Sequence, residues 1–318
     1  MAAMNILSRH CGLLLVLFCV SVSVHAAKPV PVHSIKHLFD IGGPQSNQLS
    51  MPSDVAVDKK RIYVVDGGNH RIQVFDKDGD HELTIGKEGI KNGEFRGPVG
   101  IDIDSRGRIY VADTGNHRVQ VFNKQGQFLT AVGVAGKKGT LIRPIDVEVD
   151  ERQQILYITG NNNHKLMKFN FAGHLLDEWG GNGVEEGYFR YPGTLALLKD
   201  KRIAVVDILN TRIQVFTPRG KVSLQVGEWG VLPGQLFRPK GLAVDKQGRI
   251  YVSDSYMNLV QVYSDAGRFQ YVLGDNNKPA KMETATGIAV DDEMRLYVAE
   301  MRQHKVSVHR VSNYPVGK

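Results

Sequence analysis

The feature that most constrains the fold is a unit that recurs six times along the chain. Each unit contains a stretch of the type IYVADTGNHRVQVF, and the copies begin at Ile62, Ile109, Leu156, Ile203, Ile250 and Leu296. A shorter stretch precedes each copy and opens at Pro52, Pro98, Pro144, Pro192, Pro239 and Ala285, with spacings of 46, 46, 48, 47 and 46 residues. Such close register over most of a 318-residue chain leaves no room for a separate second domain.

Each unit has the pattern of four short strands. Apolar residues alternate at Ile109 and Val111 and again at Val119 and Val121, which is the period of a strand. Turn residues separate the strands, and they include Gly where a tight hairpin requires positive φ. Four strands in a unit of about 46 residues are typical of a propeller blade. We therefore predict an all-β fold, a six-bladed β-propeller of four-stranded blades over residues 33–310.

The ends of the repeat array predict how the ring closes. The sixth unit ends near Arg310 after only three strands. The missing strand is found at the other end, because HLFDIG from His37 aligns with HELTIG from His81. We expect this N-terminal strand to complete the last blade and to remove exposed sheet edges. Residues 28–32 are then a short linker, and residues 311–318 are a C-terminal tail.

The first 27 residues differ from the rest of the chain. Arg9 is their only charged side chain, Gly12 to Val24 is an apolar run, and a small residue, Ala26, precedes the expected cleavage point. This pattern indicates a cleaved signal peptide and a periplasmic or secreted protein. The run is short for a membrane span, although an uncleaved anchor stays the alternative. Both cysteines, Cys11 and Cys19, lie inside this segment, so the mature chain would have no thiol or disulfide.

The charge of the expected mature chain argues against a nucleic-acid partner. Removing residues 1–27 leaves 39 Lys and Arg against 33 Asp and Glu, a net charge of +6. Nucleic-acid binders concentrate such charge, and this chain has no run of five like charges. We expect a monomer with no membrane span in the mature chain and no cofactor.

The repeat signature also carries a family resemblance. Three units contain Asn69-His70-Arg71, Asn116-His117-Arg118 and Asn163-His164-Lys165. With these tripeptides the chain resembles exported bacterial propellers built from NHL repeats, over about residues 33–310. The resemblance implies a propeller. It leaves the function open, because NHL propellers serve as protein-binding platforms, RNA binders, sensor domains and a few lyases.

The acids, histidines and basic residues that recur at equivalent positions of the repeats are interpreted as scaffold. Copies on separate blades lie around the ring and do not converge on one catalytic point. We expect the acids to accept backbone N–H bonds in the loop and to pair with the nearby basic residue. The set comprises Asp66, His70, Arg71, Asp113, His117, Arg118, His164, Lys165, Asp207, Arg212, Asp254, Glu300, His304 and Lys305.

Four arginines are the candidate ligand-binding residues. Each precedes a blade-opening proline by one or two positions, and they are Arg96, Arg143, Arg190 and Arg238. Guanidinium groups suit carboxylates and phosphates, so such a set can cradle an acidic partner. The alternative is that each arginine pairs with a local acid, such as Glu94, Asp146, Glu185 or Glu228.

The enzyme alternatives fit the sequence less well. Amidating lyases of this fold carry zinc-binding histidines directly after the blade-opening proline, where this chain has Ser53, Val99, Ile145, Gly193, Lys240 and Thr286. Gluconolactonase-like propellers hold a divalent cation in the channel. Asp54, Asp146 and Thr194 open inner strands here, but the glutamate-bearing first motif of that family is missing. We expect a binding module for a protein, a peptide or an acidic glycan, with no catalytic residue or metal ligand assigned. A metal-dependent lyase or hydrolase at the channel mouth stays the alternative.

Overall fold

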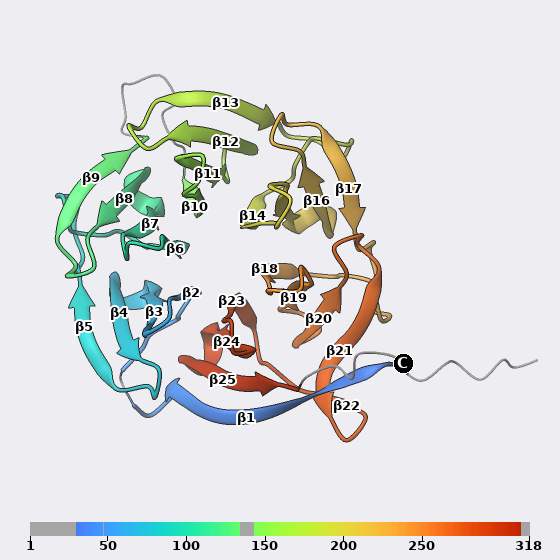
Figure 1. Ribbon diagram of the computed structural model, residues 1–318. Coiled ribbons are helices and arrows are strands. Elements are labelled where there is room, and N and C mark those ends of the chain that lie inside the picture. Colours follow the sequence, from blue (N-terminus) through green and yellow to red (C-terminus); the bar gives the residue numbers. More distant parts are fainter. Residues whose placement is uncertain (1–29, 47, 134–142, 313–318) are drawn as a thin grey trace, which may run out of the picture.

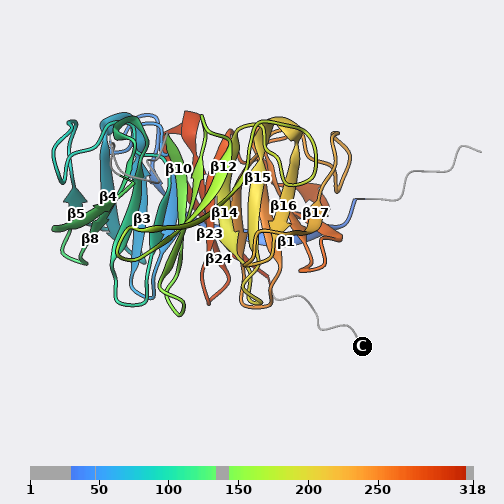
Figure 2. The same ribbon diagram turned by 90° about the horizontal axis from the view of Figure 1, so that it is seen from above.

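The structure is a computed structural model, and it describes residues 30–46, 48–133 and 143–312. The sheets stand in a ring around a central axis, and successive repeats follow one another around it (Figure 1). Seen edge-on, the ring is a disc with loops on both of its faces (Figure 2). Within the described residues, no helix is both long and apolar enough to cross a membrane. The predicted signal peptide lies outside the described residues, as does most of the predicted tail.

The first four repeats each form a separate four-stranded sheet, called a blade below. Neighbouring strands are antiparallel, because short turns join them in chain order from the axis to the rim. The strands are β2 (Asp54–Val57), β3 (Arg61–Asp66), β4 (Arg71–Asp76) and β5 (His81–Ile85), then β6 (Ile101–Ile103), β7 (Ile109–Asp113), β8 (Arg118–Phe122) and β9 (Phe128–Val132), then β10 (Pro144–Asp150), β11 (Ile155–Gly160), β12 (Lys165–Asn170) and β13 (Leu175–Gly180), then β14 (Pro192–Leu197), β15 (Ile203–Asp207), β16 (Arg212–Phe216) and β17 (Val222–Val226).

The prediction of six blades is wrong, because the strands that the structure describes form four blades and one nine-stranded sheet. The last two repeats share this larger sheet with the N-terminal strand, in the order β18-β19-β20-β21-β1-β25-β24-β23, and β22 pairs with β21. Its strands are β1 (Val32–Gly42), β18 (Pro239–Val244), β19 (Ile250–Asp254), β20 (Leu259–Tyr263), β21 (Phe269–Asp275), β22 (Lys278–Pro279), β23 (Ala285–Val290), β24 (Arg295–Glu300) and β25 (Lys305–Val311).

The larger sheet exists because β1 is long enough to pair on both of its edges. Ile35 to Gly42 run antiparallel to β25, and Val32 to Ser34 run parallel to β21. With 11 residues, β1 spans from one repeat to the other, whereas a shorter strand would complete only the last repeat. Ile35 and Ile41 anchor β1 in the core, with exposed fractions of 7% and 1%.

The hydrophobic core lies between neighbouring sheets. Val65 and Ile72 of the first blade pack in one buried cluster with Ile109 and Phe122 of the second. Similar clusters join the other neighbours around the ring. β-branched and aromatic residues suit this position, because they fill a pleated surface that is covered on both faces.

An acid at the end of the second strand of a repeat organises the loop that follows. Asp113 is fully buried, and its carboxylate accepts the backbone N–H of Arg96 at 2.8 Å and Nε of Arg118 at 2.9 Å. Asn116 and Gln120 donate to the same carboxylate. The equivalent acids Asp66, Asp207, Asp254 and Glu300 also accept backbone N–H groups from the segment that leads into their own inner strand. Each acid thus fixes the entrance to its repeat.

The histidine of the signature joins one repeat to the next. The residue at this position is left-handed in every repeat, with φ between 53° and 57°. It follows a one-turn 3-10 helix in four repeats: η1 (Gly67–Asn69), η2 (Thr114–Asn116), η3 (Ile208–Asn210) and η4 (Met301–Gln303). Its side chain accepts a backbone N–H of the following repeat in five cases: His70 from Gly97 (2.8 Å), His117 from Arg143 (3.0 Å), His164 from Tyr191 (3.1 Å), Asn258 from Thr284 (2.8 Å) and His304 from Met51 (3.1 Å).

Deleting residues 33–42 tests the role of β1. The deletion exposes the edges of β21 and β25 and removes two buried isoleucines, so we expect the free energy of unfolding to fall by several kcal/mol out of a typical total of about 5–15 kcal/mol. Thermal unfolding followed by circular dichroism measures the loss. Lys36→Ser, at an exposed site on β1, is the control. A truncated protein with the same melting temperature as the wild type would show that β1 does not close the ring.

Replacing Asp113 with Ala tests the loop acid. The change leaves the buried Arg118 side chain and the Arg96 N–H without their acceptor, so we expect a loss of about 1–3 kcal/mol in unfolding free energy, measured in urea. Asp80→Ala, at an exposed turn carboxylate, should lie within about 0.5 kcal/mol of the wild type. Equal effects of the two substitutions would contradict the scaffold role.

Candidate functional site

The four candidate arginines lie on one face of the ring. Each is at the entrance to an inner strand, beside the loop that joins the second and third strands of its repeat. The backbone N–H groups of Arg96, Arg190 and Arg238 donate to Asp113, Asp207 and Asp254, and that of Arg143 donates to His117. We call this side of the ring the arginine face. Its backbone is held in place by the loop acids and histidines.

The side chains of these arginines are exposed and have no partner among the described residues. All four residues are exposed, and no guanidinium group among them forms an ion pair or hydrogen bond with another described residue. The four expected alternative partners have other contacts. Glu94 pairs with Lys87 at 3.6 Å, and Glu228 accepts a bond from Gln235 at 3.4 Å. Glu185 accepts the backbone N–H of Val184 at 3.1 Å, and Asp146 lines the central channel. Among the described residues, no acid is therefore paired with any of these four guanidinium groups.

Lys240 adds a fifth cation that the sequence analysis did not select. It is the second residue of β18 and is partly buried, and it has no acidic partner within the described residues. Burial lowers the pKa of its amine, and the positive charge of Arg238 lowers that pKa further. The signal in the sequence was a lysine at a position where the other repeats have Ser, Val, Ile, Gly or Thr.

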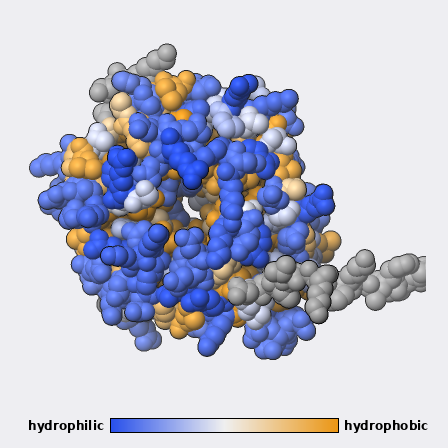
Figure 3. Space-filling view, in the orientation of Figure 1, coloured by the Kyte–Doolittle hydropathy of each residue, from blue (hydrophilic) through white to orange (hydrophobic). Residues whose placement is uncertain are grey.

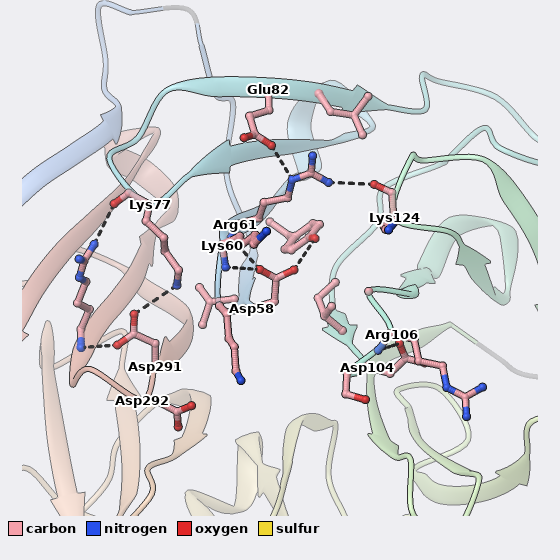
Figure 4. A pocket seen from close by; sticks show the side chains of 18 of the residues that line it. Asp58, Lys60, Arg61, Lys77, Glu82, Asp104, Arg106, Lys124, Asp291 and Asp292 are labelled. Carbon is pink, nitrogen blue, oxygen red and sulfur yellow. Dashed lines mark hydrogen bonds and ion pairs between the residues drawn. The ribbon is translucent and has the colours of Figure 1, made fainter.

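The opposite face differs in its electrostatics. It contains a hollow of about 1260 Å³, lined by the turns of the first, second and sixth repeats (Figure 4). Several of its charges pair with one another: Arg61 with Glu82 at 2.5 Å, and Lys77 with Asp291 at 3.3 Å. Asp58 accepts the hydroxyl of Tyr63 at 2.8 Å. This hollow is a mixed surface in which acids pair with several of the cations.

A narrow channel of about 180 Å³ runs along the axis, and its opening is visible at the centre of Figure 3. Asp54, Asp102, Asp146 and Glu148 line it. Each carboxylate accepts a backbone N–H from the inner strand of the next repeat. The donors are Ile101 at 3.1 Å, Val149 at 2.8 Å, Leu195 at 3.0 Å and Leu197 at 3.0 Å, in the same order. These acids therefore link neighbouring inner strands.

Burial raises the pKa of all four channel carboxyls. It raises the pKa of Asp54 and of Asp102 to about 7, because a carboxylate loses hydration inside the channel and its acidic neighbours add repulsion. The pKa values of Asp146 and Glu148 also lie well above their usual range for the same reason. Asp102 and Glu148 keep some surface open to the channel, although protein surrounds them.

The residues weighed for a metal have other partners. Asp54 and Asp146 hold backbone N–H groups, and the Thr194 hydroxyl donates to the carbonyl of Lys240. Among the described residues, no group of three or more His, Cys, Asp or Glu side chains is arranged to hold a metal ion. After the opening proline, the Ser53 hydroxyl bonds to the Val99 carbonyl. The polar groups at these positions serve contacts between repeats.

Comparison with known sequences identifies the repeat. The family described as NHL repeat matches residues 49–75, 95–122 and 238–263. These segments cover the first, second and fifth repeats, including the loop acid and the signature position of each. A search of curated protein sequences found no match.

Solved structures with the same fold include two enzymes. Virginiamycin B lyase from Staphylococcus aureus is 14% identical at a TM-score of 0.61, covering 87% of this chain and all of that one. A gluconolactonase from Xanthomonas campestris is 16% identical at 0.65, covering 91% and 99%. A protein of unknown function from Bacteroides thetaiotaomicron is 18% identical at 0.66, covering 89% and 75%. Likeness at this identity shows the fold alone. The matched segments identify NHL repeats in this chain, and the shared architecture identifies its fold as a β-propeller.

Proposed function

We propose that the chain is an exported binding module whose arginine face holds a protein, a peptide or an acidic glycan. The observation that carries the proposal is the set of four exposed guanidinium groups on an anchored backbone, none of them paired with another described residue. The proposed export rests on the signal-like residues 1–27.

The physical case for binding is preorganisation. A guanidinium group presents its donors in a planar fork that matches a carboxylate. Because the backbone at each arginine is already fixed, binding an anion has to order only the arginine side chains. A set of like charges around one face also raises the local potential and attracts an acidic partner. The opposite hollow supports binding less well, since its own acids neutralise several of its cations.

Replacing Arg96, Arg143, Arg190 and Arg238 together with Ser tests the arginine face. We expect the melting temperature to change little, because these side chains are exposed and pair with no other residue that the structure describes. We expect the affinity for an acidic probe, poly-glutamate or oligogalacturonate, to fall at least about tenfold by titration calorimetry. Wild-type affinity should also fall as NaCl is raised from about 0.05 to 0.3 M, because salt screens the contact.

A matched control changes the same charge on the opposite face. Lys59, Lys60, Arg106 and Lys124 are exposed there, and replacing them with Ser should leave probe affinity near that of the wild type. An equal loss in both variants would mean that only net charge matters, and the arginine face would then carry no site. If the arginine variant binds the probe at low salt as tightly as the wild type does, the binding site lies on another surface.

The enzyme alternative requires a functional metal site at the channel, and the channel carboxyls allow a direct test. A carboxyl whose pKa is raised on folding contributes stability that is present below its unfolded pKa and is lost as pH rises through its folded pKa. For Asp102 this window runs from about 4 to about 7. Asp102→Asn keeps a carbonyl acceptor for Val149, so we expect it to melt higher than the wild type at pH 8 and similarly at pH 4.

The same melting experiment separates a structural carboxyl from a metal ligand. Added Ca²⁺ or Zn²⁺ should leave the melting temperature of the wild type at pH 8 unchanged. A metal-dependent rise that Asp102→Asn abolishes would favour a metalloenzyme. Asp80→Asn, at an exposed carboxylate, is the control and should track the wild type at both pH values.

A further inference from the structure

The junction between the fourth and fifth repeats departs from the pattern of the other five. Elsewhere a His or Asn side chain accepts a backbone N–H of the following repeat. Thr211 occupies this position in the fourth repeat, and its hydroxyl instead donates to the carbonyl of Asn210 at 2.8 Å. The Arg238 N–H donates within its own repeat, to Asp254 at 3.0 Å. This junction therefore lacks the side-chain link that the others share.

Three aromatic rings gather on the fifth repeat at this junction. The Phe237 ring lies 4.1 Å from that of Tyr256 and 6.3 Å from that of Trp229, measured between centroids. Trp229 is 69% exposed and Tyr256 is 55% exposed. We call these three residues the aromatic platform. It belongs to the arginine face, because Phe237 directly precedes Arg238 and its N–H donates to the loop acid Asp254.

The fold does not require these rings. Trp229 forms a backbone bridge to Leu236, and Glu88 and Asn182 form the equivalent bridges in the blades where they occur, without an aromatic side chain. Phe237 occupies the position of Arg96 and Arg190, and Tyr256 that of Gly68 and Gly115. Exposed rings such as Trp229 and Tyr256, beside half-buried Phe237 and at positions where other repeats lack an aromatic residue, mark an interaction surface.

The surroundings of the platform combine aliphatic side chains with cations. Leu232 lies on the same loop as Trp229 and is 64% exposed, and Leu209, on the η3 loop of the fourth repeat, is 51% exposed. Arg238 and the partly buried Lys240 follow Phe237 along the chain and carry no ion pair within the described residues. Trp, Tyr and Arg residues in an apolar patch with a charged rim are the composition of a protein-binding hot spot.

We propose that the aromatic platform anchors an acidic peptide segment of a partner protein. An apolar or aromatic side chain of the segment would cover Trp229 and Tyr256, and its flanking carboxylates would meet Arg238 and Lys240. A saccharide fits less well, because exposed Leu209 and Leu232 add apolar side chains that cannot bond a sugar's hydroxyls. This inference rests on the proposed binding function and specifies the partner at one part of the arginine face.

Trp229 provides a local reporter. The chain has two tryptophans, and the other, Trp179, stacks on Tyr157 away from the platform. The probes are poly-glutamate, a random copolymer of Glu and Tyr, and oligogalacturonate. We expect the copolymer to bind the wild type at least about tenfold more tightly than poly-glutamate does and to change the emission of Trp229, because only the copolymer supplies an apolar anchor along with charge.

Two variants separate the anchor from the charge. Trp229→Ala/Tyr256→Ala should bind the copolymer only as tightly as poly-glutamate, with poly-glutamate affinity unchanged, by calorimetry. The four-arginine variant should lose affinity for both probes. Leu129→Ala/Leu176→Ala, at exposed sites on the outer strands β9 and β13, is the control and should bind both probes as the wild type does.

Three outcomes would overturn the inference. Equal affinities of the wild type for poly-glutamate and the copolymer would show that no apolar anchor exists. Unchanged copolymer affinity in the Trp229→Ala/Tyr256→Ala variant would place the anchor elsewhere. If oligogalacturonate quenches the emission of Trp229, and its binding is lost when Tyr256 is replaced, the platform is a saccharide site and not a peptide site. The first two results leave the proposed function of the arginine face standing. The proposed function itself fails if the four-arginine variant binds poly-glutamate as tightly as the wild type does.

Discussion

Hydrogen bonds that cross from one repeat to the next are the directional contacts on which the geometry of the ring depends. They occur at two radii. At the loops, histidines and one asparagine accept N–H groups of the following repeat. At the axis, four carboxylates do the same, and hydroxyls such as Ser53 and Thr286 reach the next carbonyl. Apolar packing between sheets is not directional, so these polar bonds help to fix how adjacent repeats align.

The repeat pattern predicted local structure well and long-range pairing poorly. Strand alternation and turn residues are local, so the strands of each repeat could be located from residues such as Ile109 and Val119. The number of sheets could not, because it depends on whether β1 meets one neighbour or two. The alignment of His37 with His81 covered the half of β1 that lies along β25. Val32 to Ser34, which merge the last two repeats, have no counterpart in the other units and gave no signal.

In the candidate site, too, the residues that recur could be predicted from the sequence, and the others could not. The four arginines could be selected because they recur. Lys240, Trp229 and Tyr256 were missed because they do not recur, and a search for consensus discards such departures. Asp102 and Glu148 were missed for another reason: their role depends on which backbone N–H of the next repeat lies opposite, which is a tertiary relation. In a repeat protein, the shared residues build the scaffold, and the exceptions are better indicators of function.

The double pairing of β1 has a consequence for the order of folding. Ile41 lies opposite Val306, and Val32 lies opposite Val272, so the first strand of the fold finds its partners among the last. During synthesis the first four blades can form from nearby segments while β1 stays without a partner. The ring then remains an open arc until the final repeat is complete. Closure is the most non-local step of folding and the one that topology slows most. Until that step the nascent arc carries two unpaired edges, which makes late-stage folding the period of greatest exposure to misassembly.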